Sequence, residues 1–330
     1  MNALYAFFAV ALLMLVAFFG VWGLGWNTLF AVMIPYAALA IFIIGLIYRV
    51  VKWARAPVPF HIPTTCGQQK SLPWIKSDRI ESPSSTMGVV ARMAMEILLF
   101  RSLFRNDKVQ LEDKKRVTFQ GNRVLWLGGL VFHWSLLIIL FRHSRLFMQP
   151  VPDFMIFVRD IDGILQGLIP AVFITDIAIL MALTYLFLRR VVFPQVRYIS
   201  LPSDYFALFL LLGVVILGVL VKTAWKVDIE GVKVLAMGMF TFNPVVPEGI
   251  GPAFYIHIFL ASVLLAYFPF SKLMHGPGIF LSPTRNLINN SRAVRHINPW
   301  DYPVKVHTYE EWEDEFREAI RGVGLPLEKE

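Results

Sequence analysis

Long apolar segments recur along the whole chain and are separated by polar stretches. Each is about as long as the roughly 20-residue helix that crosses the hydrocarbon core of a bilayer. Six segments meet this criterion: Ala3–Leu24, Thr28–Tyr48, Val124–Phe147, Gly163–Leu188, Tyr205–Val221 and Phe254–Met274. The pattern predicts an all-α integral membrane protein built as a bundle of six transmembrane helices. The first segment lacks the charged start and the small-residue cleavage site of a signal peptide, so we interpret it as a retained helix.

Composition and charge agree with a membrane location. Hydrophobic residues make up 57% of the chain and charged residues 16%, whereas about one-quarter of a soluble domain is charged. Basic residues favour the cytoplasmic ends of membrane helices. With the N-terminus inside, twelve Lys and Arg flank the inner helix ends and six flank the outer ends. Both termini are therefore predicted to be cytoplasmic, and a basic collar against anionic lipid explains the formal charge of +8 without any nucleic acid.

The segments divide the chain into three predicted parts. These are an extra N-terminal transmembrane helix (1–27), a membrane domain (28–276) with a cytoplasmic loop at about 49–123, and a cytoplasmic C-terminal tail (277–330). Within the loop, "SSTMGVVARMAMEILLFRSLFRN" begins with a helix start signal and mixes apolar residues with charges. It predicts a helix that either lies in the membrane interface or packs on the inner ends of the bundle.

The tail carries the signals of one more helix. Thr308 and Glu311 form a capping-box pattern, and Gly322 is the expected C-cap. Trp312, Phe316 and Ile320 make a narrow apolar stripe on an otherwise acidic helix. A cytoplasmic partner subunit or the membrane domain itself would have to cover that stripe.

The histidines are the candidate functional residues of this sequence. His61, His296 and His307 lie in polar segments, where a solvated imidazole is ordinary, and Cys66 is the only cysteine, so no internal disulfide is expected. The other four histidines lie in two apolar segments: His133 and His143 in one, His257 and His275 in the other. Ionisable groups in hydrocarbon are costly and usually functional, although a single membrane histidine can also serve as a packing hydrogen bond.

Helical geometry predicts how these histidines pair. Eighteen residues are five full turns, so His257 and His275 share a helix face and lie roughly 27 Å apart, whereas His133 and His143 are roughly 15 Å apart. The two helices run in opposite directions, which pairs His133 with His275 and His143 with His257. We call these the inner pair and the outer pair, after the predicted orientation. Straight helices leave a mismatch of about 12 Å, which helix tilt and a kink at Pro269 must absorb.

Two facing imidazoles in a membrane bundle are typical of haem, whose iron takes two axial nitrogens. Zinc needs four converging ligands, which neither pair supplies. The sequence favours two b-type haems, with one haem or none as the alternatives. Arg142, Arg145 and Lys272 neighbour the candidate ligands and are either partners of haem propionates or interface anchors. Asp176 either orients a ligand imidazole or makes a helix-packing hydrogen bond.

These spacings, together with "FPFSKLMH" and "LFLRRVVFPQVR", resemble the gamma-subunit cytochrome b family of respiratory nitrate reductase over roughly residues 28 to 276. The resemblance implies that the four histidines are axial ligands of two haems and that quinol is oxidised near the outer one. Where that family has a lysine at the quinol site, this chain has Arg159, Asp160 and Asp162. They are candidates for the quinone site, and the two aspartates are alternatively caps of the fourth predicted transmembrane helix.

The extra first helix, the long loop and the tail "RAVRHINPWDYPVKVHTYEEWEDEF" resemble the DsrM branch of this family, the membrane cytochrome b subunits of DsrMKJOP complexes of sulfur metabolism such as sulfate reduction. That resemblance implies menaquinol as the electron partner. It also implies a cytoplasmic iron–sulfur subunit similar to heterodisulfide reductase, DsrK, and further DsrMKJOP subunits as protein partners.

The sequence therefore predicts the electron-transfer subunit of a membrane-bound quinol oxidoreductase. Within the same class, a cytochrome b subunit of a nitrate reductase or of a heterodisulfide reductase is the alternative. A haem-free membrane anchor and a transporter are the alternatives from other classes. No inverted repeat or pair of interrupted helices supports the transporter.

Overall fold

The computed structural model describes residues 1–56, 78–112, 116–282, 285–289 and 306–329. His61, Cys66 and His296 lie outside these described residues. The chain divides into two units, which we describe separately: a membrane unit, Met1–Arg49 and Met93–Ile279, and a peripheral unit, Val50–Arg92 and Phe280–Glu330.

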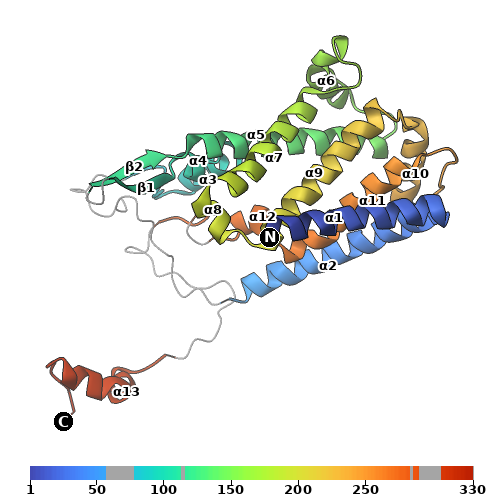
Figure 1. Ribbon diagram of the computed structural model, residues 1–330. Helices are drawn as coiled ribbons and strands as arrows, with labels where there is room; N and C mark the ends of the chain where they lie inside the picture. Colours follow the sequence, from blue (N-terminus) through green and yellow to red (C-terminus); the bar gives the residue numbers. More distant parts are fainter. Residues whose placement is uncertain (57–77, 113–115, 283–284, 290–305, 330) are drawn as a thin grey trace. The chain divides into compact units, whose positions relative to one another are not determined.

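Helices make up nearly all of the membrane unit (Figure 1). The long helices are α1 (Asn2–Phe18), α2 (Ile34–Ala54), α5 (Arg123–His143), α7 (Ile174–Val192), α9 (Pro202–Thr223) and α11 (Pro252–Tyr267). The π-helical turns Phe19–Gly23 and Leu29–Met33 extend α1 and α2. Shorter helices are α3 (Thr86–Leu99), which begins in the peripheral unit, α4 (Arg101–Phe104), α6 (Asp153–Asp162), α8 (Pro194–Ile199), α10 (Ile229–Phe240) and α12 (His275–Ile279).

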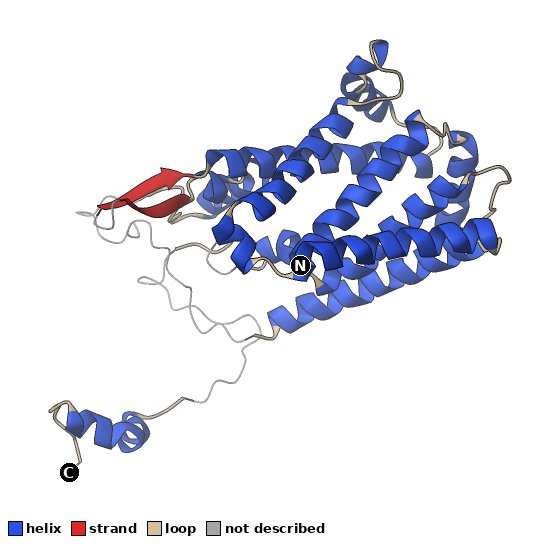
Figure 2. Cartoon of the chain, viewed as in Figure 1, coloured by secondary structure: helices blue, strands red, loops and turns tan. Residues whose placement is uncertain are grey.

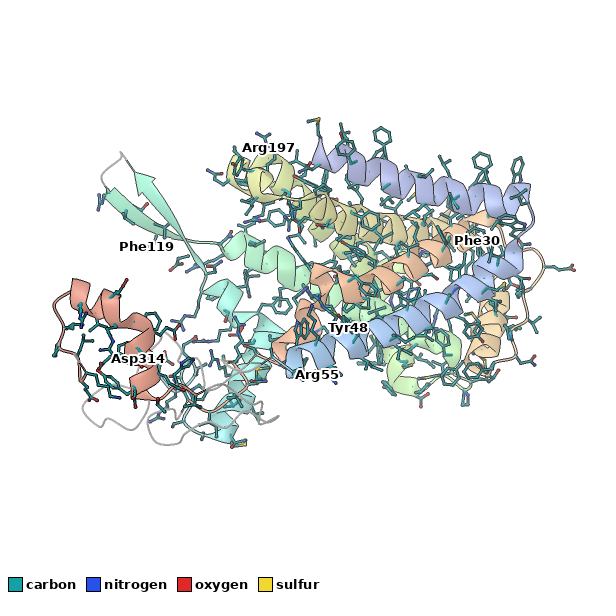
Figure 3. All side chains as sticks on the ribbon, turned by 90° about the horizontal axis from the view of Figure 1, so that it is seen from below. Phe30, Tyr48, Arg55, Phe119, Arg197 and Asp314 are labelled. Atoms are coloured by element: carbon teal, nitrogen blue, oxygen red, sulfur yellow. The ribbon has the colours of Figure 1, made fainter. Side chains whose placement is uncertain are left out.

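The long helices pack side by side. α5 packs against α7, α7 against α9, and α9 against both α11 and α1. One apolar core lies between α5, α7 and α9 around Ile179 and Leu183, and a second joins α1, α9 and α11 around Leu210 and Leu260. Phe30 enters this second core among the helices, as Figure 3 shows. Large apolar side chains cover the outside of the bundle, as expected where the solvent is lipid.

Five described helices are long and apolar enough to cross a membrane: Asn2–Gly23, Leu29–Ala54, Arg123–Phe147, Pro202–Thr223 and Pro252–Phe270. The predicted fourth segment, Gly163–Leu188, is wrong at its start. Gly163 ends α6, a short 3-10 helix follows at Ile164–Gly167, and α7 begins only at Ile174. Pro170 and Ala171, whose φ is +64°, interrupt the apolar run.

The predicted last segment, Phe254–Met274, is not one continuous helix. α11 ends at Tyr267, two 3-10 turns follow at Phe268–Phe270 and Lys272–Met274, and α12 starts at His275. Between the turns, Ser271 is extended, with φ −114° and ψ 177°. The prediction that His257 and His275 share a face of one straight helix is therefore wrong, because Pro269 ends the helix rather than only bending it.

The loop before α5 contains a β-hairpin that the all-α prediction missed. β1 (Asp107–Glu112) pairs antiparallel with β2 (Arg116–Gly121), from Asp107 opposite Gly121 to Glu112 opposite Arg116. Figure 2 shows it as the two strands of an otherwise helical chain, and Phe119 is labelled on it in Figure 3. The predicted loop helix is present as α3 and α4.

In the peripheral unit, the backbone N–H of Asn289 donates to the Pro83 carbonyl at 2.9 Å. The predicted tail helix is present as α13 (Tyr309–Gly322), and its capping box is formed: Thr308 N–H donates to Glu311, and Glu311 N–H donates to the Thr308 hydroxyl. Gly322 is the last helical residue rather than the cap. The glycine with positive φ lies at position 324.

Gly45 permits a close contact at the broken end of the last transmembrane helix. A Cβ at this position of α2 would lie 2.8 Å from the Pro269 Cβ. We expect Gly45→Ala to destabilise the protein by about 1–3 kcal/mol, because the rigid proline ring cannot yield without moving the break. Thermal unfolding in detergent would measure the loss. Gly23→Ala is the matched control, since no described atom lies within 4 Å of its added Cβ, and equal melting temperatures for both variants would contradict the prediction.

Candidate functional site

The inner histidine pair is formed in the structure. His133 lies within α5 and His275 begins α12. Their ring centroids are 5.9 Å apart and the ring planes are inclined at 88°. The break in the helix after Tyr267 thus brings the two imidazoles face to edge, although they come from segments more than 140 residues apart.

The outer pair lies at the other end of α5. His143 is the last residue of α5, and His257 lies in the second turn of α11. The two imidazoles are close enough to interact electrostatically. α9 passes directly behind His257, because a Cβ at Gly218 would come within 3.0 Å of the His257 ring. A larger residue at this point of α9 would press on the imidazole, which would have to shift by a few tenths of an ångström.

All four imidazoles share one hydrogen-bonding arrangement. His133 Nδ1 bonds the Gly129 carbonyl at 2.7 Å and His143 Nδ1 bonds the Ile139 carbonyl at 2.7 Å. His257 Nδ1 bonds the Val214 carbonyl and His275 Nδ1 bonds the Lys272 carbonyl, both at 2.9 Å. A carbonyl only accepts, so each Nδ1 carries a proton and each Nε2 keeps its lone pair. This is the arrangement that orients a metal-binding histidine.

These donor sets fit haem. An imidazole whose Nε2 keeps its lone pair could hold a haem iron, which would supply one-electron transfer there. None of the four rings is packed into the apolar core: His143 and His275 are exposed, and His133 and His257 are half-buried. Among the residues that the structure describes, no three His, Cys, Asp or Glu side chains converge on one point. Two ligands per level match the two axial positions of a haem iron.

A buried charge cluster lies beside the outer pair. Arg142 Nε is 3.0 Å from Asp162 Oδ2, and its Nη2 is 3.4 Å from Asp176 Oδ1. Lys222 Nζ, from α9, donates to Asp176 Oδ2 at 2.6 Å. Two cations and two anions therefore balance where α5, α7 and α9 meet, and the Lys222 ammonium is near enough to act on both outer imidazoles. We call these four residues the charge cluster.

Thr175 and Phe173 complete the cluster. Asp162 accepts from the Thr175 backbone N–H at 2.9 Å and from its hydroxyl at 2.7 Å. Asp162 thus caps the start of α7, which is one of its two predicted roles. The Phe173 ring faces both cations, 3.7 Å from the Arg142 guanidinium carbon and 4.8 Å from the Lys222 ammonium.

Asp176 lies in the first turn of α7, because α7 begins at Ile174 and not at Gly163, the start of the predicted segment. Besides the two cations it accepts from the Phe173 backbone N–H at 3.1 Å. These contacts correspond to the helix-packing hydrogen bond, which is one of the two roles predicted for Asp176. No described contact joins Asp176 to an imidazole.

The remaining predicted site residues are spread over the surface. Arg159 and Asp160 form an exposed ion pair at 2.7 Å in α6. Arg145 lies in the 3-10 turn Ser144–Phe147 that follows α5. Lys272 pairs with the buried Asp204 of α9 at 2.8 Å, and its backbone carbonyl holds His275. The structure therefore separates Arg159 and Asp160 from Asp162, which belongs to the charge cluster.

Comparison with known proteins defines the family. The model of the nitrate reductase gamma subunit family matches residues 85–296, which contain all four candidate ligands. The chain belongs to this family. The matched region begins after α2, so both α1 and α2 precede it, whereas the sequence resemblance was placed from residue 28 onward.

Two relatives from archaea are similar to this chain over most of its length. The "Hdr-like menaquinol oxidoreductase cytochrome b-like subunit" of Archaeoglobus fulgidus is 49% identical over 282 residues, covering 83% of this chain and 84% of the relative. The protein of the same name from Archaeoglobus profundus is 42% identical over 276 residues, covering 81% of each.

Sequence reasoning missed Lys222, Phe173 and Gly218. Lys222 was counted only as a flanking charge, because nothing in an apolar run shows that a lysine at its end turns back toward an aspartate on another helix. Gly218 lies in "VVILGVLV", and its place opposite His257 follows from the packing of α9 on α11.

The contribution of the charge cluster to the stability of the protein can be tested by removing one of its carboxylates. Asp176→Ala leaves the Lys222 ammonium without its carboxylate partner, so we expect a loss of about 3–5 kcal/mol of stability, as for other broken buried ion pairs. Asp160→Ala breaks an exposed pair and should change stability by less than about 1 kcal/mol. Thermal unfolding in detergent compares the two. Asp176→Ala combined with Lys222→Met should recover part of the loss, and no recovery would contradict the pairing as its cause.

Proposed function

We propose that this chain is the dihaem b subunit of a menaquinol-oxidising respiratory complex of the DsrMKJOP type. It passes electrons between menaquinol and a cytoplasmic iron–sulfur subunit such as DsrK. The observation that carries the proposal is the set of four membrane histidines in two pairs, each with Nδ1 donated to a backbone carbonyl and Nε2 free. Membership of the family and the menaquinol oxidoreductase names of both relatives support it.

His133 and His275 would hold one haem b, and His143 and His257 the other. Haem supplies reversible one-electron transfer when bound. The protein's part is to fix the ligands, and the four carbonyls do this by setting tautomer and ring orientation. Lys272 and Arg145 lie beside the ligands and remain our candidates for propionate partners, whereas the Arg142 guanidinium is already paired inside the charge cluster.

The quinol would bind near the outer pair. There the exposed Asp160 carboxylate accepts both bonds from Arg159 at Oδ1, which leaves Oδ2 to take a proton. Asp162 instead caps α7. We therefore assign substrate contact to Arg159 and Asp160, and a supporting role to Asp162.

The proposed chain crosses the cytoplasmic membrane six times, with both termini inside. α7 is the sixth span beside the five apolar helices. It carries three charged residues, Asp176, Arg189 and Arg190. Asp176 is paired with Lys222, which lowers the cost of placing a carboxylate there. The excess of Lys and Arg on the proposed inner side sets the orientation.

Haem quantitation on the purified protein tests this function. We expect two haems b per chain, both reducible by a menaquinol analogue. His143→Ala or His257→Ala should remove one haem and leave the inner one, and His133→Ala or His275→Ala should do the reverse, because each iron loses one of two protein ligands. His307→Ala, in the tail, is the control and should retain both haems.

A protein that contains no tetrapyrrole when produced with ample iron and porphyrin would overturn the proposal. So would a chain whose haem content is indifferent to all four histidine substitutions.

A further inference from the structure

Phe100 stands out as a strained residue beside a candidate iron ligand. Its backbone is left-handed, with φ 49° and ψ 49°, a conformation that a bulky side chain adopts only when its surroundings impose it. Its ring lies 4.8 Å from the His133 ring, edge to face at 73°. It is the only residue between α3 and α4, and α3 ends at the residue before it.

Two tryptophans of α5 impose this break. Trp126 Nε1 donates to the Leu99 carbonyl at 2.7 Å, and Trp134 Nε1 donates to the Leu98 carbonyl at 3.0 Å. These are carbonyls of the last turn of α3, which have no partner within their own helix. The indole N–H groups thus take the place of the backbone N–H groups that the next helical turn would supply. Trp126 and Trp134 lie on either side of His133 in the sequence of α5.

A carboxylate fixes the other side of the turn. Glu96, which is buried, accepts from the Ser102 backbone N–H at 3.1 Å and from the Ser102 hydroxyl. A negative group at the first turn of α4 is favourable, and it ties α3 to α4 across Phe100. The backbone of the left-handed residue is therefore held from both sides, which fixes the direction in which its ring leaves the chain.

The His133 imidazole is in turn enclosed by rings. Phe132 lies 4.9 Å from it, at 78°, and His275 completes the group at 5.9 Å. The Nδ1 bond to Gly129 fixes one end of the imidazole, but a single hydrogen bond still allows the ring to rotate about it. Phe100 is a contact from outside α5 and α12, and it limits this rotation.

We propose that Phe100 is a positioning residue for His133: the strained turn, held by Trp126, Trp134 and Glu96, presses an aromatic ring against the inner ligand and sets its orientation and its exclusion from water. The inference rests on the proposed function, in which His133 holds an iron. An apolar wall beside a haem ligand lowers the local dielectric, which disfavours the more highly charged ferric state and so raises the reduction potential.

The test compares Phe100→Leu with Phe100→Tyr in the full chain. Both keep a side chain with a Cβ at the left-handed position, so the backbone cost is matched, but only tyrosine keeps the ring. We expect Phe100→Leu to lower the midpoint potential of the inner haem and to shift its ferric EPR signal, which reports the angle between the axial imidazole planes. Phe100→Tyr should behave as the wild type. The outer haem is the internal control and should not change.

A second pair of variants tests the position of the Phe100 ring through the hydrogen bond that α5 makes to α3. Trp134→Phe keeps an aromatic side chain but removes the N–H that caps α3, so the inner signal should shift in the same direction as in Phe100→Leu. Trp22→Phe, at a residue that stacks on Phe18 in α1, should shift neither haem. The inner and outer signals are assigned by their loss in His275→Ala and His143→Ala.

Unchanged inner signals in Phe100→Leu and Trp134→Phe, with two haems present, would overturn the positioning role and leave the proposed function intact. Equal shifts of both haems would also overturn it, because they would indicate a general loosening of the bundle. A wild-type protein without haem would overturn both proposals.

Discussion

Polar groups inside the membrane unit must find their partners within the protein, because lipid offers none. Each membrane histidine uses a nearby backbone carbonyl for one ring nitrogen, and three of the four carbonyls belong to the same segment as the imidazole. The exception is His257, whose carbonyl partner Val214 lies on the neighbouring α9. There the glycine at position 218 lets the two helices approach closely enough for the bond to form.

Two irregularities of the backbone in this bundle, at Ser271 and at Phe100, change the position of a histidine or of its neighbour. The extended Ser271 ends one helical turn and caps the next, since its hydroxyl accepts from the Leu273 N–H at 3.1 Å. The resulting change of direction delivers His275 to His133. The left-handed Phe100 ends α3 in the same way, with indole N–H groups in place of the missing turn. Departures from straight helices are therefore what bring the inner group of rings together.

Much of this arrangement could be predicted from the sequence, but the argument that paired His133 with His275 was partly wrong. Hydrophobic periodicity located five of the spans, and histidine spacing with antiparallel order predicted which imidazoles would meet. The spacing argument assumed a continuous helix through Pro269, and the true path follows from packing of that proline on Gly45, which no local pattern shows. The hairpin was missed because "DKVQLE" and "RVTFQG" are short, charged strands inside a loop whose neighbours are helical. The charge cluster was missed because its four members come from separate segments that only tertiary packing brings together.

The two histidine pairs lie in different surroundings, and that difference has a physical consequence. The outer pair adjoins a cluster with two cations and two anions, whose net charge is zero but whose Lys222 ammonium lies on the side of the imidazoles. The inner pair adjoins aromatic rings. A charged environment responds to a change of charge mainly through oriented dipoles and ion pairs, whereas an aromatic one responds weakly. Any redox group held at both levels would therefore meet two different dielectric environments in one bundle, so the protein can separate the properties of two chemically identical cofactors without changing their ligands.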